Sequence, residues 1–160
     1  GGELGNGETL PIDQQVRQYC PKEHAHLLFL PTASHDTESY SEAVKRVYEA
    51  LGCEVASLYI YEATPTLEEL QRALDWADIV YIGGGNTRDL LRRLHETGFD
   101  RVLLNAMEDR EDLVVAGISA GASMWCRASY ADCDIMDGTS DHMIFLNCLN
   151  YLPFVFNPHA

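Results

Sequence analysis

Short apolar runs alternate with amphipathic windows along most of this chain, from His26 onward. The run at residues 26–32, HLLFLPT, is continuously apolar, as expected of a strand that is covered on both faces. Strands separated by helical windows are typical of a parallel sheet with crossover helices. The predicted strands are residues 26–32, 54–61, 78–84, 112–118 and 151–157.

The windows between these strands carry apolar residues at helical spacing. Ser39 and Glu42 predict a capping box at the start of the first window, and Thr66 and Glu69 predict another at the start of the second. The predicted helices cover residues 38–51, the window after Thr66, the window from Asn86 or Thr87 to near Gly98, residues 99–107, and the first turns of a helix at 122–126.

The segment that follows Cys126 has no clear period. Residues 128–143 are rich in Asp, Ser and Gly, which predicts a loop before the last strand. The whole pattern predicts one α/β domain over residues 1–160, built around a mostly parallel sheet. Its ends, GGELGNGE and FNPHA, look cut, and we expect chain segments to be missing at both.

Charge and composition narrow the classes of function. The 25 acidic and 11 basic side chains give a net charge of −14, which disfavours nucleic acid and anionic membranes as partners. No apolar window reaches the roughly 20 residues of a membrane span, and no secretory leader opens the sequence. The five cysteines are scattered without C-x-x-C spacing, which indicates reduced thiols. We therefore expect a cytoplasmic protein.

Two loops at the predicted carboxyl ends of strands are unusual, and ligands collect at this edge of a parallel sheet. The first is Gly83-Gly84-Gly85-Asn86-Thr87, in which consecutive glycines favour a sharp turn with exposed N–H groups. A phosphate-binding loop would explain the glycines, but the loop has neither a Lys-Ser/Thr pair nor G-x-G-x-x-G spacing. The second loop is Gly117-Ile118-Ser119-Ala120-Gly121, a G-x-S-x-G sequence between a strand and a helix.

Ser119 has two interpretations. A serine at this position can cap the helix that follows, and for an isolated G-x-S-x-G we favour this interpretation by roughly three to one. The buried strand before it and the glycine loop beside it instead favour a nucleophile elbow. The amides of Gly85 and Ala120 are then the natural donors of an oxyanion hole.

A serine nucleophile needs a base and an acid that orients the base. His35 and His159 both follow predicted strands at the relevant edge of the sheet, and His159 is favoured because Pro158 stiffens its approach. The other histidines fit ordinary surface positions. Spacing alone leaves four candidate acids open: Asp132, Asp134, Asp137 and Asp141.

The stretches YIGGGNTRDLL, GISAGA and FNPH, in that order, resemble the serine peptidases typified by peptidase E (aspartyl dipeptidase) and cyanophycinase. The resemblance covers nearly the whole chain. It implies a three-layer, flavodoxin-like fold related to class I glutamine amidotransferases. It also implies that Ser119 is the nucleophile, His159 the base and Asp132 the acid, with oxyanion donors at Gly85 and Ala120.

We therefore expect a hydrolase that needs no cofactor or metal and cleaves small peptides, such as dipeptides with an N-terminal or β-linked aspartate. Asn86 is expected to contact the substrate, and Arg88 and Arg127 are candidate partners for its carboxylate. A homodimer is one oligomeric state open to the protein. Two alternatives remain: an esterase or amidase that acts on another small acyl substrate, and a binding or regulatory homologue without turnover.

Overall fold

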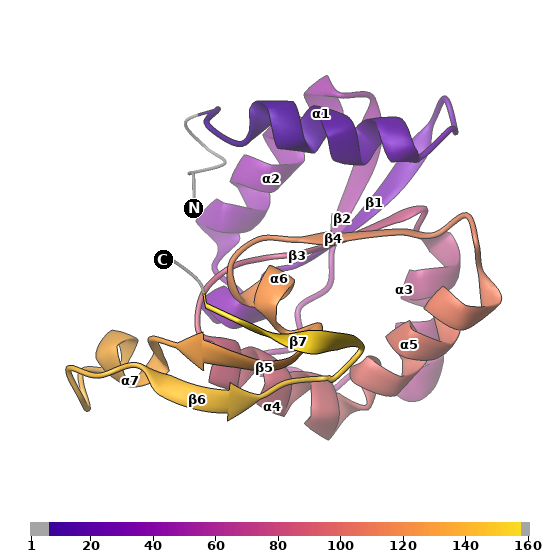
Figure 1. Ribbon diagram of the computed structural model, residues 1–160. Coiled ribbons are helices and arrows are strands. Elements are labelled where there is room, and N and C mark those ends of the chain that lie inside the picture. The colour runs from indigo at the N-terminus through magenta and orange to yellow at the C-terminus, as the bar shows by residue number, and fades with distance from the viewer. Residues whose placement is uncertain (1–6, 158–160) are drawn as a thin grey trace.

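Four parallel strands form the central sheet of the computed structural model, in which residues 7–157 are described. Their order is β2-β1-β3-β4, so the chain returns past β1 to add β3 and β4 on its other side (Figure 1). Leu28 at the centre of β1 pairs with Ala56 on one neighbour and with Val80 on the other. The strands are β1 (Ala25–Leu30), β2 (Cys53–Ser57), β3 (Ile79–Ile82) and β4 (Val114–Gly117).

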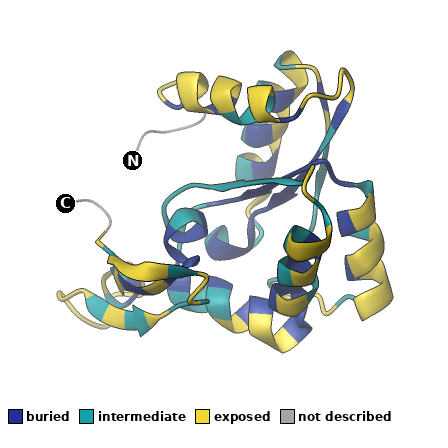
Figure 2. Cartoon of the chain, turned by 45° about the vertical axis from the view of Figure 1, so that its right-hand side comes forward, coloured by how far each residue is buried: buried dark blue, intermediate teal, exposed yellow. Residues whose placement is uncertain are grey.

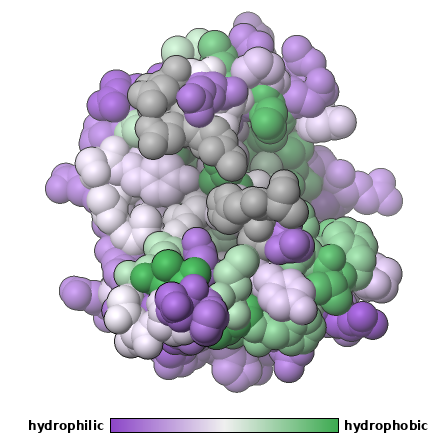
Figure 3. All heavy atoms as spheres, turned by 60° about the vertical axis from the view of Figure 1, so that its left-hand side comes forward, coloured by the Kyte–Doolittle hydropathy of each residue, from purple (hydrophilic) through white to green (hydrophobic). Residues whose placement is uncertain are grey.

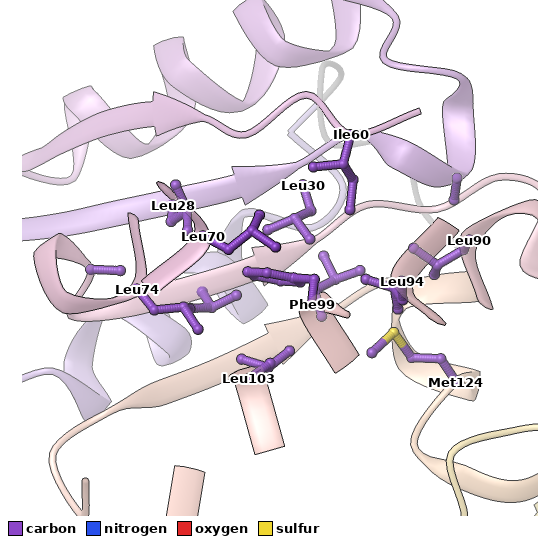
Figure 4. Packing of buried hydrophobic residues seen from close by; sticks show 14 of the residues in the cluster. Leu28, Leu30, Ile60, Leu70, Leu74, Leu90, Leu94, Phe99, Leu103 and Met124 are labelled. Atoms are coloured by element: carbon purple, nitrogen blue, oxygen red, sulfur yellow. The ribbon is translucent and has the colours of Figure 1, made fainter. Parts of the chain in front are cut away.

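Helices cover both faces of this sheet, which gives the three layers expected (Figure 1). Successive β1 side chains point to opposite faces. Leu27 and Phe29 pack with the α1 and α2 layer, whereas Leu28 and Leu30 pack with the α3, α4 and α5 layer (Figure 4). The helices are α1 (Leu10–Tyr19), α2 (Glu38–Ala50), α3 (Leu67–Trp76), α4 (Thr87–Thr97) and α5 (Phe99–Asp109).

The central strands are the most buried part of the structure (Figure 2). Every residue of β3 is buried, and β1 is buried except at His26. This two-sided burial explains why these strands have continuously apolar sequences instead of alternating ones. The predicted α/β class with a parallel sheet is confirmed, and the architecture is consistent with the flavodoxin-like fold.

A second, smaller sheet follows the short helix α6 (Ala120–Ser123). Its order is β6-β5-β7, with β6 antiparallel and β7 parallel to the central strand. The helix α7 lies between β5 and β6 in the sequence. Large apolar side chains are exposed here, among them Phe145 and Phe154, and Figure 3 shows apolar surface on this side of the molecule. The elements are β5 (Cys126–Ala131), α7 (Cys133–Met136), β6 (Ile144–Asn147) and β7 (Leu152–Phe156).

Most predicted elements are present, and one predicted cap is correct in detail. The Thr66 side chain accepts a hydrogen bond from the Glu69 N–H at 3.2 Å, and the Glu69 carboxylate accepts one from the Thr66 N–H at 2.7 Å. Asn86 is the N-cap of α4. The predicted box of Ser39 and Glu42 is wrong, because the N-cap of α2 is Thr37, two residues before Ser39, and Ser39 already lies within the helix.

The chain after Ser119 differs most from the prediction. The helix expected at 122–126 is a single turn that ends at Ser123, and Cys126 already belongs to β5. The predicted loop 128–143 contains most of β5 and all of α7. The helix α1 was not predicted. These corrections place part of the acidic segment on the short helix α7, which contacts the start of α4.

Candidate active site

Ser119 lies between β4 and α6 in a strained backbone conformation. Its φ of 51° and ψ of −114° fall outside the regions that residues with side chains normally adopt. Ser119 is at the N-cap position of α6, yet its hydroxyl makes no capping hydrogen bond. A capping role therefore does not explain the strain, whereas a nucleophile elbow requires it.

The two glycines of G-x-S-x-G permit this turn because no side chain fits at either position. A Cβ on Gly117 would lie 2.3 Å from the carbonyl oxygen of Gly121. A Cβ on Gly121 would lie 2.1 Å from the carbonyl oxygen of Ile82, at the end of β3. The turn from β4 into α6 is thus packed directly on the neighbouring strand.

The triple-glycine loop lies beside Ser119. A Cβ on Gly84 would be 3.1 Å from the Ser119 Cβ. Gly85 has a φ of 139°, and a side chain there would meet the Ala33 carbonyl at 2.1 Å. The structure therefore brings the two unusual loops together, with backbone from the end of β1 supporting the first.

Hydrogen bonds hold this loop on both sides of Gly85. The Gly84 N–H donates to the Tyr40 hydroxyl at 3.2 Å, and the Asn86 N–H donates to the Ala33 carbonyl at 2.7 Å. Within residues 7–157, no acceptor takes the N–H of Gly85 or of Ala120. Amides without an internal partner next to a serine hydroxyl are what an oxyanion hole needs.

Tyr40 was not singled out from the sequence, although it holds the glycine loop. The helical spacing of Tyr40 on α2 predicts an ordinary core residue. Its ring packs edge-on against Phe29. Burial raises the pKa of the Tyr40 hydroxyl, which keeps it neutral. Only the three-dimensional contact with Gly84 reveals its place at the site.

Three of the four candidate aspartates have partners among the described residues. Asp134 forms an ion pair with Arg88, and Asp137 accepts a hydrogen bond from the Asn86 side chain at 3.1 Å. Asp141 is at the surface, and its Oδ1 lies 3.1 Å from the Nε2 of His142. Asp132 is half-buried at the N-cap of α7 and has no ion pair with a described residue.

The residues predicted to contact substrate differ in how far their side chains are already engaged by other groups of the protein. Asn86 is 2% exposed, and its side chain caps the Asp89 N–H at 3.2 Å while donating to Asp137. The Arg88 guanidinium is already paired, with Asp134 of α7 and with Asp137 at the C-cap of that helix. Arg127 is exposed on β5.

The two candidate bases have different positions. His159 lies outside the described residues; the last strand before it, β7, is parallel to β5 with Ser129 opposite Phe156. His35 is exposed in a left-handed conformation, and its Nε2 lies 2.8 Å from Asp89 Oδ2. It follows β1, whereas Ser119 follows β4, and β3 lies between these strands. Two strand spacings, about 10 Å in all, separate β1 from β4, so His35 and Ser119 follow strands that are not neighbours.

A cavity of about 510 Å³ opens at the carboxyl ends of β1 and β2, on the His35 side of the sheet. Its lining is acidic and does not include Ser119. No group of three or more His, Cys, Asp or Glu side chains within the described range is arranged to hold a metal ion. Nor does any described helix have the length and apolar character needed to cross a membrane. The cavity is lined by His35, Asp36, Glu38, Tyr59, Glu62 and Ala63.

Fold and site together describe an α/β protein with a strained serine between β4 and α6, beside a triple-glycine loop. The model of peptidase family S51 matches residues 1–160, and the chain belongs to this family. It is 32% identical over 159 residues to the uncharacterized peptidase YgaJ of Bacillus subtilis, covering 99% of this chain and 65% of that protein. It is 27% identical over 150 residues to peptidase E of Nostoc sp., covering 91% of this chain and 57% of that protein.

A solved structure supports the same assignment. The crystal structure assigned to a peptidase E protein of Listeria monocytogenes EGD-e matches with a TM-score of 0.66 and 28% identity, over 91% of this chain and 70% of that one. The resemblance inferred from the three sequence motifs is thereby confirmed. The chain spans about half to two thirds of the length of the curated relatives it matches.

Proposed function

We propose that this protein is a serine peptidase in which Ser119 attacks a peptide carbonyl. The observation that carries the proposal is the strained backbone of Ser119, whose hydroxyl caps no helix N–H, next to the N–H groups of Gly85 and Ala120, for which no acceptor lies within residues 7–157. Membership of peptidase family S51 supports the same reaction class. The site is assembled from the carboxyl ends of β3 and β4, the usual location of active sites in open parallel sheets.

In the proposed mechanism, His159 takes the proton of the Ser119 hydroxyl as the oxygen bonds to the carbonyl carbon. The negative charge moves to the carbonyl oxygen, where the N–H groups of Gly85 and Ala120 stabilise it. The same histidine then protonates the leaving amine, and the acyl-enzyme forms. Water, deprotonated by His159, releases the acyl group and restores the serine.

Asp132 is the proposed acid that orients His159. Its support is that Asp134, Asp137 and Asp141 are engaged elsewhere, whereas Asp132 is half-buried and unpaired among the described residues. An acid in this role stabilises the imidazolium and selects its tautomer. The contact of Asn86 with substrate, a homodimer and a cytoplasmic location stay predictions.

The proposed substrates are dipeptides with an N-terminal or β-linked aspartate, as the resemblance to aspartyl dipeptidases implies. The test measures hydrolysis of a panel of Asp-X and neutral dipeptides by the protein and by Ser119→Ala. Ser119→Ala should abolish turnover while the melting temperature is retained. Ser123→Ala is the matched control, because Ser123 is a buried serine of α6 whose hydroxyl donates to the Ala120 carbonyl of the same helix at 3.3 Å. Turnover that survives Ser119→Ala contradicts the proposal.

The two alternatives differ in their reactivity with a fluorophosphonate probe. An esterase or amidase with the same machinery is labelled at Ser119 and cleaves acyl esters or amides but no dipeptide. A binding homologue is not labelled and binds peptides without turnover. The strained conformation of Ser119 favours both catalytic classes over the binding homologue.

A further inference from the structure

The start of α4 and the short helix α7 are joined by side chains from both segments. The guanidinium of Arg88 donates to the Asp134 carboxylate and lies 3.8 Å from a carboxylate oxygen of Asp137. The Asn86 amide donates to the other oxygen of Asp137 at 3.1 Å. We call these contacts of Asn86 and Arg88 with Asp134 and Asp137 the α4–α7 bridge.

A buried thiol completes the bridge. Cys133 is fully buried, and its Sγ accepts a hydrogen bond from the Arg88 N–H at 3.3 Å. The first N–H groups of a helix have no partner within the helix, so this contact satisfies one of them. The first residue of α7 is therefore fixed on the first turn of α4.

The bridge joins the two loops that carry the proposed catalytic groups. Gly85 directly precedes Asn86, and Asp132 directly precedes Cys133. No described side chain holds the Asp132 carboxylate by an ion pair, so its position depends on how α7 is held. We propose that Arg88 is a positioning residue, which fixes Asp132 relative to the Gly85 oxyanion loop through Asp134 and Asp137. This inference rests on the proposed function.

Charge makes Arg88 well suited to this task. Asp132, Asp134 and Asp137 lie within six residues of sequence in a protein of net charge −14. Arg88 compensates two of these carboxylates, and the hydrogen bond to Asp134 raises the pKa of its guanidinium. Because Arg88 is already paired with α7, it is poorly placed to hold a substrate carboxylate.

The test compares Arg88→Ala and Arg88→Lys with the parent on the best dipeptide of the panel. Arg88→Ala should lower kcat about 10- to 100-fold with KM changed less than about twofold, because a displaced acid impairs the reaction more than ground-state binding. Arg88→Lys should give an intermediate kcat, since one ammonium cannot reach both carboxylates as the forked guanidinium does. Arg92→Ala is the matched control, because Arg92 lies on α4 but pairs with Asp89 and Glu96.

The pH profile separates positioning from simple loss of charge. If Asp132 is displaced from the catalytic base, the acidic limb of kcat/KM should move to lower pH, because the imidazolium loses its partner. Loss of a nearby positive charge alone would move this limb to higher pH. Arg88→Lys retains the positive charge, so an acidic limb that moves to lower pH in this variant reports displacement of Asp132 and not loss of charge; this variant carries the test should Arg88→Ala not fold.

Failure of the positioning role of Arg88 can be told apart from failure of the proposed function. Equal kcat in Arg88→Ala and Arg92→Ala overturns the positioning role, as does an acidic limb that moves to higher pH. A raised KM with kcat retained also overturns it, because Arg88 would then bind substrate. If instead Ser119→Ala leaves turnover unchanged, the proposed function itself has failed, and this inference falls with it.

Discussion

The backbone of Gly121 lies against the carbonyl oxygen of Ile82, so that an added Cβ would be only 2.1 Å from that oxygen. Alanine is the better helix former by about 1 kcal/mol, yet the neighbouring strand leaves no room for its methyl group. We expect Gly121→Ala to push α6 away from β3 and to lower kcat at least about 100-fold through displacement of Ser119. Dipeptide hydrolysis measures this effect.

The control for Gly121→Ala is Gly52→Ala. Gly52 has a φ of 83°, and a Cβ there would meet nothing within 4 Å. This variant should lose about 1 kcal/mol of stability from the left-handed backbone and keep its kcat. Equal kcat in the two variants would contradict the role of the Gly121 contact.

Tyr40→Phe should lower kcat several-fold with little effect on the melting temperature. The change removes the acceptor of the Gly84 N–H, so the loop that carries Gly85 is held less firmly. Steady-state kinetics on the same dipeptide give the measurement. Tyr59→Phe serves as the comparison, because Tyr59 is an exposed tyrosine outside this loop. The interpretation fails if both variants turn over substrate at the parent rate.

Tyr48→Phe should destabilise the fold by about 1–3 kcal/mol. The Tyr48 hydroxyl donates to the Asp13 carboxylate at 2.9 Å, and both residues are buried. Removal of the donor leaves Asp13 with the Thr9 hydroxyl as its remaining side-chain partner among the described residues. Urea unfolding followed by circular dichroism measures the loss. Tyr19→Phe, at an exposed position of α1, should change the free energy of unfolding by less than about 0.5 kcal/mol.

The ionised Asp78 carboxylate should stabilise the fold at neutral pH, and this contribution should be lost in acid. Burial by itself would raise the pKa of this carboxyl, but hydrogen bonds from the Lys22 ammonium at 2.6 Å and the His26 N–H at 2.9 Å outweigh it and lower the pKa. A carboxyl with a lowered pKa in the folded state stabilises the fold above its unfolded pKa of about 3.9. That contribution is lost as the pH falls from about 4 through the lower folded value.

The measurement is the free energy of unfolding as a function of pH for the parent and Asp78→Asn. The variant should be less stable at pH 7, and its stability should fall less steeply below pH 4. Asp75→Asn, at an exposed position of α3, should follow the parent curve. Parallel curves for the parent and Asp78→Asn would show that Asp78 does not carry this dependence.

The central sheet could be predicted because its strands are apolar on both faces and are followed by turn residues. Thr66 and Asn86 marked helix starts, because short polar side chains satisfy the free N–H groups there. The strand predicted to end at residue 61 stops earlier, at Ser57, although the Leu58 N–H still bonds to Phe29.

The helix α1 could not be predicted from apolar periodicity, because apolar side chains lie on its exposed face and an acidic side chain lies on its buried face. Leu10 and Ile12 are exposed, whereas Asp13 is buried through its hydrogen bonds to Thr9 and Tyr48. Apolar periodicity does not detect a helix whose buried residue is a carboxylate. The strand β5 was missed for a related reason, since its buried Ser129 resembles a loop residue in sequence.

The site could be predicted only as two loops and a set of candidate partners. The G-x-S-x-G spacing singled out Ser119 as the candidate nucleophile. Both glycines are needed in the structure, because a side chain at either position would clash with neighbouring backbone. The Arg88 pairing that occupies Asp134 could not be predicted, since these residues are far apart in sequence and meet only after α4 and α7 have packed. No spacing rule connects them.

The close packing of the Ser119 turn on Ile82, and of the Gly85 loop on Ala33, has a consequence for folding during synthesis. These backbone contacts, which pack the turn at Ser119 and the glycine loop on neighbouring segments, form only once β1, β3 and β4 are paired. Parallel pairing of distant strands is a slow, non-local event in folding. A nascent or partly folded chain thus has the serine but lacks this backbone geometry, so the proposed hydrolysis requires completion of the native sheet.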